Sequence, residues 1–338
     1  MKTRQLTILG IETSCDDTAA AVVKDGKQIL SSIVSSQNDI HRRYGGVVPE
    51  IASRKHVQMI NIVVEEALRE AKTAMEKIDL ISVTNRPGLI GSLLVGVGAA
   101  KAISYACNIP MIAVNHLKAH LFSNLLANPE IEGNFIGLIV SGGHSSIYHV
   151  DGQFHITELG HTVDDAAGEA FDKIARYLGM GYPGGPIIDR ISREGDENMI
   201  DFPRPMWDSG DFNFSFSGLK TALIYLTRKN KGLTHESNLP GLAASFQKAI
   251  VDVLVEKSIR AARHKGLDRI AISGGVAANS RLREEFIRRC REENISVFIP
   301  PLKLCMDNAA MVGCLGYYEY LGGKESSLDV DVYSRSDL

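Results

Sequence analysis

The sequence has few cysteines, and none of its five cysteines forms part of a CxxC pair. They are scattered along the chain and odd in number: Cys15, Cys107, Cys290, Cys305 and Cys314. This pattern excludes a disulfide framework and a cysteine-rich zinc site, and it is typical of a reducing compartment.

The sequence also lacks a large charge excess and an N-terminal apolar segment. The chain has 37 basic and 40 acidic residues, which give a formal net charge of −3. Nucleic-acid or membrane binding would therefore need a local basic patch. Glu12 directly follows the apolar run LTILGI, so we expect neither a signal peptide nor a membrane span there. We expect a soluble, cytoplasmic protein without membrane contact.

What is present is an ordinary globular composition, 44% apolar and 23% charged, over 338 residues. This length exceeds what one hydrophobic core usually supports, so two domains are expected. The first part of the chain predicts three strands, a helix of 3.6-residue period, and then alternating strands and helices. The predicted segments are strands 6–12, 18–24 and 28–37, a helix around 57–71, strand 80–85, helix 92–107, strand 111–115 and a helix from 116.

The same order recurs in the second part, interrupted by an insertion rich in proline, glycine and aromatic residues. The predicted segments are strands 135–142, 145–150 and 154–159, a helix within 164–179, the insertion at about 180–240, helix 242–265, strand 269–275, a helix from 277, strand 297–300 and a helix from 307. Alternation predicts an α/β protein whose sheets are mostly parallel, with helices on both faces. The repetition predicts two such domains facing a cleft; one large doubly wound sheet is the alternative.

Residues 1–127, together with about 315–338, are predicted to form the first domain. Residues 128–314, including the insertion, are predicted to form the second.

Three turns at strand ends carry residues suited to ligand binding. The first, IETSCDDT, brings together Glu12, Asp16 and Asp17, which repel one another unless a metal, water or donor-rich ligand balances them. The others, IVSGGHSS (139–146) and ISGGVAANS (272–280), contain glycine pairs that let the backbone approach an anion. Together they favour a nucleotide site, although each turn alone could serve only turn geometry.

Two carboxylates and a further glycine pair are weaker candidates for the same site. Asp172 lies in EAFDK, and Asp189 follows GYPGGP. Either carboxylate could accept a ribose hydroxyl, whereas turn chemistry or a surface ion pair would explain them equally well.

His116 and His120 are four residues apart in NHLKAH, the helical spacing for two ligands of one metal ion. Leu117 stands where a metalloprotease of the HExxH type has its glutamate base, which argues against that activity. Asp307 is a candidate third ligand, but its position before NAAMVGCLG is also typical of a helix N-cap.

Taken together, the motifs resemble one family closely: the TsaD (formerly Gcp or YgjD) tRNA adenosine threonylcarbamoyltransferases. The matching blocks follow one another from residue 10 to about 311: GIETSCDDT, YGGVVPEIASRKHV, PGLIGSLLVG, NHLKAHL, LIVSGGHS, DDAAGEAFDK, YPGGP, FPRPM, FSFSGLKTA, SGGVAANSRLR and CMDNAAM. The resemblance implies a duplicated actin-like (ribonuclease H-like) fold of the superfamily of actin, hexokinase and heat-shock ATPases. One departure is Arg86, where the family usually has glycine before the Pro of PGL.

The resemblance also implies the site. His116, His120 and Asp307 would bind one divalent ion, Fe(II) or Zn(II). The substrate, threonylcarbamoyl-AMP, would be held by Ile139, Val140, Ser141, Gly142, Gly143, Asp172, Gly185, Asp189, Gly274, Gly275 and Asn279. Glu12 and Asp16 are candidate catalytic residues that would orient the attacking amine or accept its proton.

The implied partners are tRNA, the paralogue TsaB, the ATPase TsaE and a TsaC-type synthase that makes the adenylate. Two groups of basic residues are candidates for tRNA contact: Arg42, Arg43, Arg54 and Lys55, and Arg281, Arg283, Arg288 and Arg289. Two alternative activities remain: a metallo-glycopeptidase, and a nucleotide-binding actin-like module or kinase.

Overall fold

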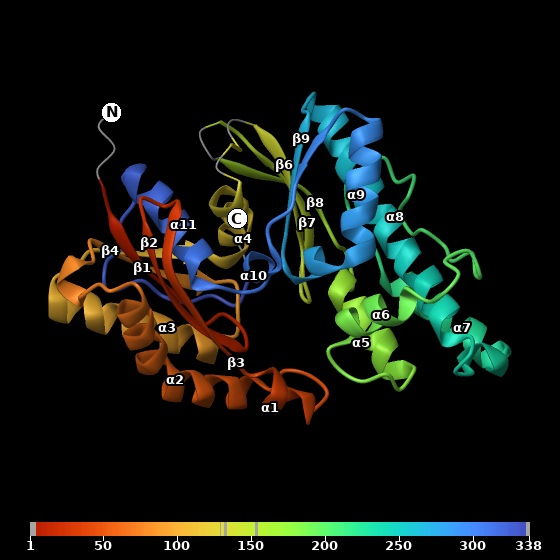
Figure 1. Cartoon of the computed structure of the whole chain (residues 1–338), viewed down its shortest axis with the longest axis horizontal. Coiled ribbons are helices and arrows are strands. Elements are labelled where there is room, and N and C mark those ends of the chain that lie inside the picture. The colour runs from red at the N-terminus through yellow and green to blue at the C-terminus, as the bar shows by residue number, and fades with distance from the viewer. Residues whose placement is uncertain (1–4, 129, 132–133, 153–154, 336–338) are drawn as a thin grey trace. The chain divides into compact units, whose positions relative to one another are not determined.

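The computed structural model describes residues 5–128, 130–131, 134–152 and 155–335. The chain divides into two compact units. Unit 1 comprises Met1–Ile131 and Pro300–Leu338, and unit 2 comprises Glu132–Ile299 (Figure 1).

Unit 1 is a five-stranded sheet with helices on both faces. Its strands are β1 (Thr7–Glu12), β2 (Asp17–Lys24), β3 (Gln28–Ser36), β4 (Leu80–Arg86) and β5 (Met111–Asn115). Its helices are α1 (Asn38–Arg42), α2 (Pro49–Glu70), the 3₁₀ turn η1 (Met75–Lys77), α3 (Ile90–Cys107), α4 (His116–Ala127), α10 (Leu302–Cys305) and α11 (Ala309–Leu321).

The buried strand β2 shows how this sheet is covered on both faces. Ala20 and Val22 belong to the core shared with α2 and α3, whereas Ala21 and Val23 pack with the start of α11 (Figure 1). Successive side chains of a strand point to opposite faces, so a strand buried on both sides must be apolar throughout. This explains the unbroken small apolar run of β2.

Unit 2 repeats the plan. Its strands are β6 (Phe135–Val140), β7 (Ser145–Val150), β8 (Ile156–His161), β9 (Arg269–Ser273) and β10 (Ser296–Phe298). Its helices are α5 (Ala167–Tyr177), α6 (Gly184–Ser192), α7 (Ser217–Lys229), η2 (Lys231–Thr234), α8 (Leu239–Lys265), η3 (Gly275–Ala278) and α9 (Ser280–Glu292). The insertion predicted at about 180–240 therefore contains α6 and α7.

The two sheets have the same strand order. It is β3-β2-β1-β4-β5 in unit 1 and, read from the same end, β8-β7-β6-β9-β10 in unit 2. In both, the first three strands are antiparallel and the last two join in parallel. The predicted duplication is therefore present, but the expectation of mostly parallel sheets is wrong. Short connections link the first three strands of each sheet, and such connections produce antiparallel pairs.

The boundaries differ from the predicted ones mainly near the C-terminus. The chain returns to unit 1 at Pro300 rather than at about 315, because α10 packs against α4 and α11 packs against the unit 1 sheet. Strand β8 begins at Ile156, and Phe154, where the sequence predicted its start, lies outside the described residues.

Within the described part of the chain, α3 is the one helix with the length and hydropathy of a membrane span, with a mean hydropathy of 1.5 over 18 residues. Leu93, Val97 and Ala100 of α3 lie in the core of unit 1. One face of α3 therefore packs in the core of unit 1, and 28% of the 18-residue window is buried.

Helix α9 carries a network of ion pairs centred on Glu285. The Glu285 carboxylate accepts hydrogen bonds from Arg288 at 2.5 Å and from Arg281 at 2.9 Å. Arg281 also contacts Glu197, and Arg289 contacts Glu256 of α8. The hydrogen bond from Arg288 is the largest influence on the pKa of Glu285, which falls to about 2.

We expect Glu285→Gln to lower the free energy of unfolding by about 1–3 kcal/mol at neutral pH, because it removes the charge that the arginines contact. The folded-state pKa lies below the usual 4.5, so this stabilisation is present above that value and is lost as the pH falls toward 2. Urea unfolding between pH 2 and 7 measures the difference, with Glu284→Gln on the same helix as the control. A difference that does not change with pH would contradict the assignment.

Candidate metal centre and ligand pocket

The two histidines lie at the start of α4. The helix begins at His116 because the Asn115 side chain caps it, accepting hydrogen bonds from the backbone N–H groups of Leu117 (2.8 Å) and Lys118 (3.1 Å). His120 follows one turn later, and the two imidazole centroids are 4.6 Å apart. Both side chains are largely buried.

Asp307 contacts both imidazoles. Its Oδ1 lies 3.0 Å from Nε2 of His120 and 3.5 Å from Nε2 of His116. The capping alternative for Asp307 is wrong, because Asn308 caps α11 by accepting a hydrogen bond from the Met311 N–H group. Capping by the next residue leaves the Asp307 carboxylate available to the histidines.

These three side chains fit a transition-metal ion. One ligand atom from each of His116, His120 and Asp307 lies within 4.8 Å of the others. Two imidazole nitrogens and one carboxylate oxygen suit Zn²⁺ or Fe²⁺ and leave coordination positions for other ligands.

Glu12, at the end of β1, lies behind His116 and is fully buried. Its Oε2 is 2.9 Å from Nδ1 of His116 and accepts a hydrogen bond from the Thr84 hydroxyl at 2.7 Å. Its Oε1 accepts one from the Ser14 N–H group at 2.5 Å. Both carboxylate oxygens are thus occupied by protein groups.

The charges of this cluster shift its pKa values strongly. Burial acts to raise the pKa of Glu12, but the charge and hydrogen bond of His116 outweigh it and the pKa is lowered. Burial likewise opposes protonation of His116, whereas Glu12 and Asp307 favour it and raise its pKa to about 9. This pKa favours the protonated form of His116 at neutral pH, so a metal ion that binds its Nε2 must displace a proton.

The turn between β1 and β2 contains a further perturbed carboxylate. Burial is the main cause that raises the pKa of Asp17 to about 7, and Asp307, Asp16 and Glu12 add to it. One oxygen of Asp17 is buried without a hydrogen-bond partner among the described residues. Asp16 is partly exposed. The sequence placed Asp17 in this acidic turn but not among the candidate site residues, since burial cannot be read from the motif.

In unit 2, two glycine turns lie side by side because β6 and β9 are parallel neighbours, with Ile139 opposite Ser273. Ile139 and Val140 are buried within β6, while Gly142 and Gly143 have open space where a side chain would begin. Gly274 has φ +91°, and a Cβ there would lie 2.5 Å from the Val140 carbonyl oxygen. Only glycine fits at position 274, where the two turns come this close together.

The α5–α6 junction holds Asp172 and Gly185. The Asp172 carboxylate accepts a hydrogen bond from the Gly184 N–H group at 2.6 Å, and burial raises its pKa. Gly185 is the second residue of α6, and a Cβ added to it would meet no atom within 4 Å. The Asp172 carboxylate is therefore hydrogen-bonded to the backbone, whereas Gly185 faces open space.

Asp189 and Asn279 hold the start of α9. Asp189 accepts hydrogen bonds from the Ser280 N–H and hydroxyl groups at 3.1 and 2.7 Å. The Asn279 Oδ1 caps α9 through Leu282, and its Nδ2 donates to Gln247 at 2.7 Å. The helix consequently begins at Ser280, after the 3₁₀ turn η3, and not at residue 277 as predicted.

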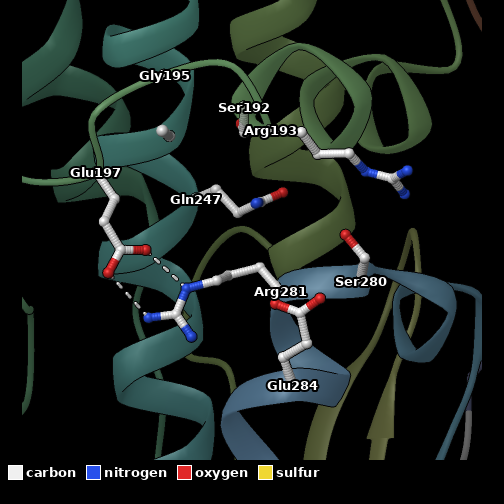
Figure 2. Close-up of a pocket in the computed structure, with 9 residues that line it drawn as sticks. Ser192, Arg193, Gly195, Glu197, Gln247, Ser280, Arg281 and Glu284 are labelled. Carbon is white, nitrogen blue, oxygen red and sulfur yellow. Dashed lines mark hydrogen bonds and ion pairs between the residues drawn. The ribbon is translucent and has the colours of Figure 1, made fainter.

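A pocket of about 560 Å³ lies beside these two residues. Figure 2 shows Gln247 of α8 directed into it between Arg193 and Arg281. The remaining lining residues are Ser192, Gly195, Glu197, Ala244, Ser280 and Glu284. Sequence patterns gave no indication of Gln247, because it lies within an amphipathic helix and is distant along the chain from every glycine turn.

Arg86, the departure from the family pattern, stacks over the ring of Tyr333 with 5.7 Å between its guanidinium carbon and the ring centroid. The Tyr333 N–H group also donates to the Asn85 carbonyl oxygen. Arg86 therefore contacts the C-terminal segment of unit 1.

A family model described as "TsaD: tRNA N6-adenosine threonylcarbamoyltransferase" matches residues 28–314. The chain belongs to this family. A TsaD relative from Caldicellulosiruptor saccharolyticus is 51% identical over 95% of both chains. One from Thermosipho africanus is 52% identical over 95% of this chain and 96% of its own. The resemblance inferred from the motifs is confirmed.

Solved structures support the predicted fold class. HypF from T. kodakarensis matches 96% of this chain and 49% of its own with a TM-score of 0.64 at 16% identity. A ROK hexokinase from Thermus thermophilus matches 94% of this chain and 99% of its own with a TM-score of 0.51 at 19% identity. At these identities the likeness concerns the fold alone, and it confirms the duplicated actin-like architecture for this TsaD family member.

Proposed function

We propose that this chain transfers the threonylcarbamoyl group of threonylcarbamoyl-AMP to tRNA. The acceptor is the exocyclic amine of the adenosine 3′ of the anticodon, in tRNAs that read codons starting with A. The observation that carries the proposal is the convergence of His116, His120 and Asp307 in a chain that belongs to the TsaD family.

We assign one Zn²⁺ or Fe²⁺ ion to His116, His120 and Asp307. When bound, the ion would supply Lewis-acid polarisation of phosphate and carbonyl oxygens. The protein holds its part of the site rigidly, since the histidines lie on one capped helix and Asp307 directly precedes another.

We assign the adenosine end of the substrate to unit 2. The open glycines at 142, 143 and 185 let a ribose or phosphate approach the backbone. Gly274 and Gly275 follow β9, and the parallel pairing of β9 with β6 brings them to the same end of the sheet as Gly142 and Gly143. Asp172, Asp189 and Asn279 adjoin these turns, and the pocket around Gln247 is large enough for a purine base.

In the transfer, the adenosine amine forms a bond to the carbamoyl carbon, and the bond from that carbon to the phosphate oxygen breaks. AMP leaves with the electron pair, and the amine loses one proton. We propose Asp16 or Asp17 as the proton acceptor. A pKa of about 7 for Asp17 matches what a base needs at neutral pH, whereas both oxygens of Glu12 are already hydrogen-bonded.

The test is transfer of labelled threonine to unmodified tRNA in the presence of bicarbonate, ATP, a TsaC-type synthase, TsaB, TsaE and this chain. We expect label at the adenosine 3′ of the anticodon only when this chain is present. A tRNA with guanosine at that position is the control and should remain unlabelled. No label in the complete mixture, or peptide cleavage by this chain instead, would overturn the proposal.

We propose that TsaB and TsaE act with this chain in the cytoplasm. Helices α2 and α3 leave apolar side chains exposed, which supports a protein partner at this surface: Val57, Ile62, Leu94 and Tyr105. We propose that the paralogue TsaB binds there. Omitting each partner in turn from the transfer assay tests the set.

For tRNA, Arg54 and Lys55 of α2 are the better supported candidates, since Arg42 of α1 is paired with Asp39. On α9, Arg281, Arg288 and Arg289 are paired with glutamates. Among the described residues, Arg54 and Lys55 of α2 have no carboxylate partner. Unpaired cations can neutralise backbone phosphates, which supports assigning tRNA contact to α2.

We expect the double variant Arg54→Glu with Lys55→Glu to bind tRNA roughly tenfold more weakly at 0.1 M salt, with a shallower salt dependence, because phosphate contacts are lost. Filter binding across a salt series measures both. The control is Lys229→Glu with Lys231→Glu, the same charge change on two exposed residues, the last of α7 and the first of η2. Equal weakening in both variants would indicate only a general charge effect and refute the assignment.

A further inference from the structure

The Glu12 carboxylate is positioned to act on one of the two histidines. It lies 2.9 Å from Nδ1 of His116, and it is fully buried. Two other donors hold it in place, the Thr84 hydroxyl and the Ser14 N–H group. A carboxylate held on three sides cannot turn away from the imidazole.

This contact determines which nitrogen of His116 is available to a metal ion. A carboxylate only accepts hydrogen bonds, so Nδ1 must carry the proton toward Glu12. In the neutral ring the free lone pair is then on Nε2, the nitrogen on the Asp307 side. A carboxylate behind a metal-binding histidine fixes its tautomer and orientation and makes it a stronger donor.

His120 lacks such support. Its Nε2 contacts Asp307 at 3.0 Å, but its Nδ1 is buried without a hydrogen-bond partner among the described residues. The two histidines are therefore held differently: Nδ1 of His116 has a carboxylate partner, whereas Nδ1 of His120 has no hydrogen-bond partner among the described residues.

We propose that Glu12 is a positioning residue that holds His116 with Nε2 directed toward the metal ion and so strengthens metal binding. The inference rests on the metal site assigned above. It gives Glu12 a role distinct from the amine-orienting or proton-accepting role that the sequence suggested.

Replacement by glutamine tests the role because it keeps the shape but not the acceptor pattern. If the amide oxygen faces His116, the NH₂ group meets the Ser14 N–H donor. If the amide oxygen faces Ser14, the NH₂ group meets Nδ1 and favours the tautomer with its proton on Nε2. Either arrangement disturbs the contact that leaves Nε2 free.

We expect Glu12→Gln to bind Zn²⁺ 10- to 100-fold more weakly than the unaltered chain, in competition with a chromophoric chelator. Ser14→Ala is the matched control, since it removes the other side chain near Nδ1 of His116, at 3.1 Å, and should change the affinity less than threefold. In ¹⁵N NMR spectra of the zinc-loaded protein, the protonated Nδ1 signal of His116 should change in Glu12→Gln and persist in Ser14→Ala. Wild-type affinity and signals in Glu12→Gln would overturn the inference.

Two further measurements distinguish loss of the Glu12 role from misfolding and from absence of the metal site. If Glu12→Gln does not fold, as judged by circular dichroism, Thr84→Val removes one of the donors that hold Glu12. It should weaken Zn²⁺ binding about threefold to tenfold, and unchanged affinity would then overturn the inference. Failure of the unaltered chain to bind Zn²⁺ or Fe²⁺ stoichiometrically would instead refute the metal site itself, which separates the two proposals.

Discussion

Replacing His120 with alanine should abolish threonylcarbamoyl transfer, lowering its rate by on the order of 10³-fold or more. The variant loses one of the three side chains of the candidate metal site, which also comprises His116 and Asp307. Metal-assisted stabilisation of developing charge amounts to several kcal/mol. The labelled-threonine assay measures the rate, and elemental analysis of the purified chain measures bound iron and zinc. We expect both to fall together.

The matched control is Leu117→Ala, which alters a buried residue of the same helix without touching a ligand. It should cost about 2–4 kcal/mol of unfolding free energy and still retain metal and transfer activity in the folded protein. Full activity of His120→Ala, or of protein stripped of metal, would refute the role of the site.

The second large effect is expected at Gly185. Tryptophan there should weaken binding of AMP or threonylcarbamoyl-AMP at least 100-fold, because the side chain would project into the open space beside the α6 terminus. The melting temperature should change little, since a Cβ at position 185 meets no atom within 4 Å and glycine is a poor helix former. Calorimetric titration with AMP and thermal unfolding measure the two quantities.

Gly218→Trp provides a control of the same kind. Gly218 is also the second residue of a helix, α7, and a Cβ there would meet only Pro205 Cγ at 3.8 Å. It should leave nucleotide affinity within about threefold of the unaltered chain. Equal loss in both variants, or none at Gly185, would contradict the assignment of Gly185 to the substrate site.

The duplication of the fold could be predicted because each half repeats the order of strands and helices. The pairing directions could not be predicted so well. Alternation of strands and helices suggested parallel sheets, whereas the short connections among the first three strands of each half produce antiparallel pairs. The return of the chain at Pro300 was also missed, since it depends on α10 packing against α4.

The site residues, too, could be predicted from the sequence only in part. The spacing of His116 and His120 predicted a shared helix face, which the structure confirms. The role of Asp307 remained open, because a carboxylate before a helix is an ordinary cap, and only the structure assigns the cap to Asn308. Glu12 behind His116 could not be foreseen, because the two residues are 104 positions apart in the chain.

The contact between His120 and Asp307 joins chain positions 187 residues apart, and all of unit 2 lies between them in the sequence. A cation held by both would act as a reversible cross-link that closes this long loop and fastens the returning C-terminal segment to α4. Metal binding would therefore also stabilise the fold of unit 1, and the stability of unit 1 would depend on the concentration of the ion in the cell.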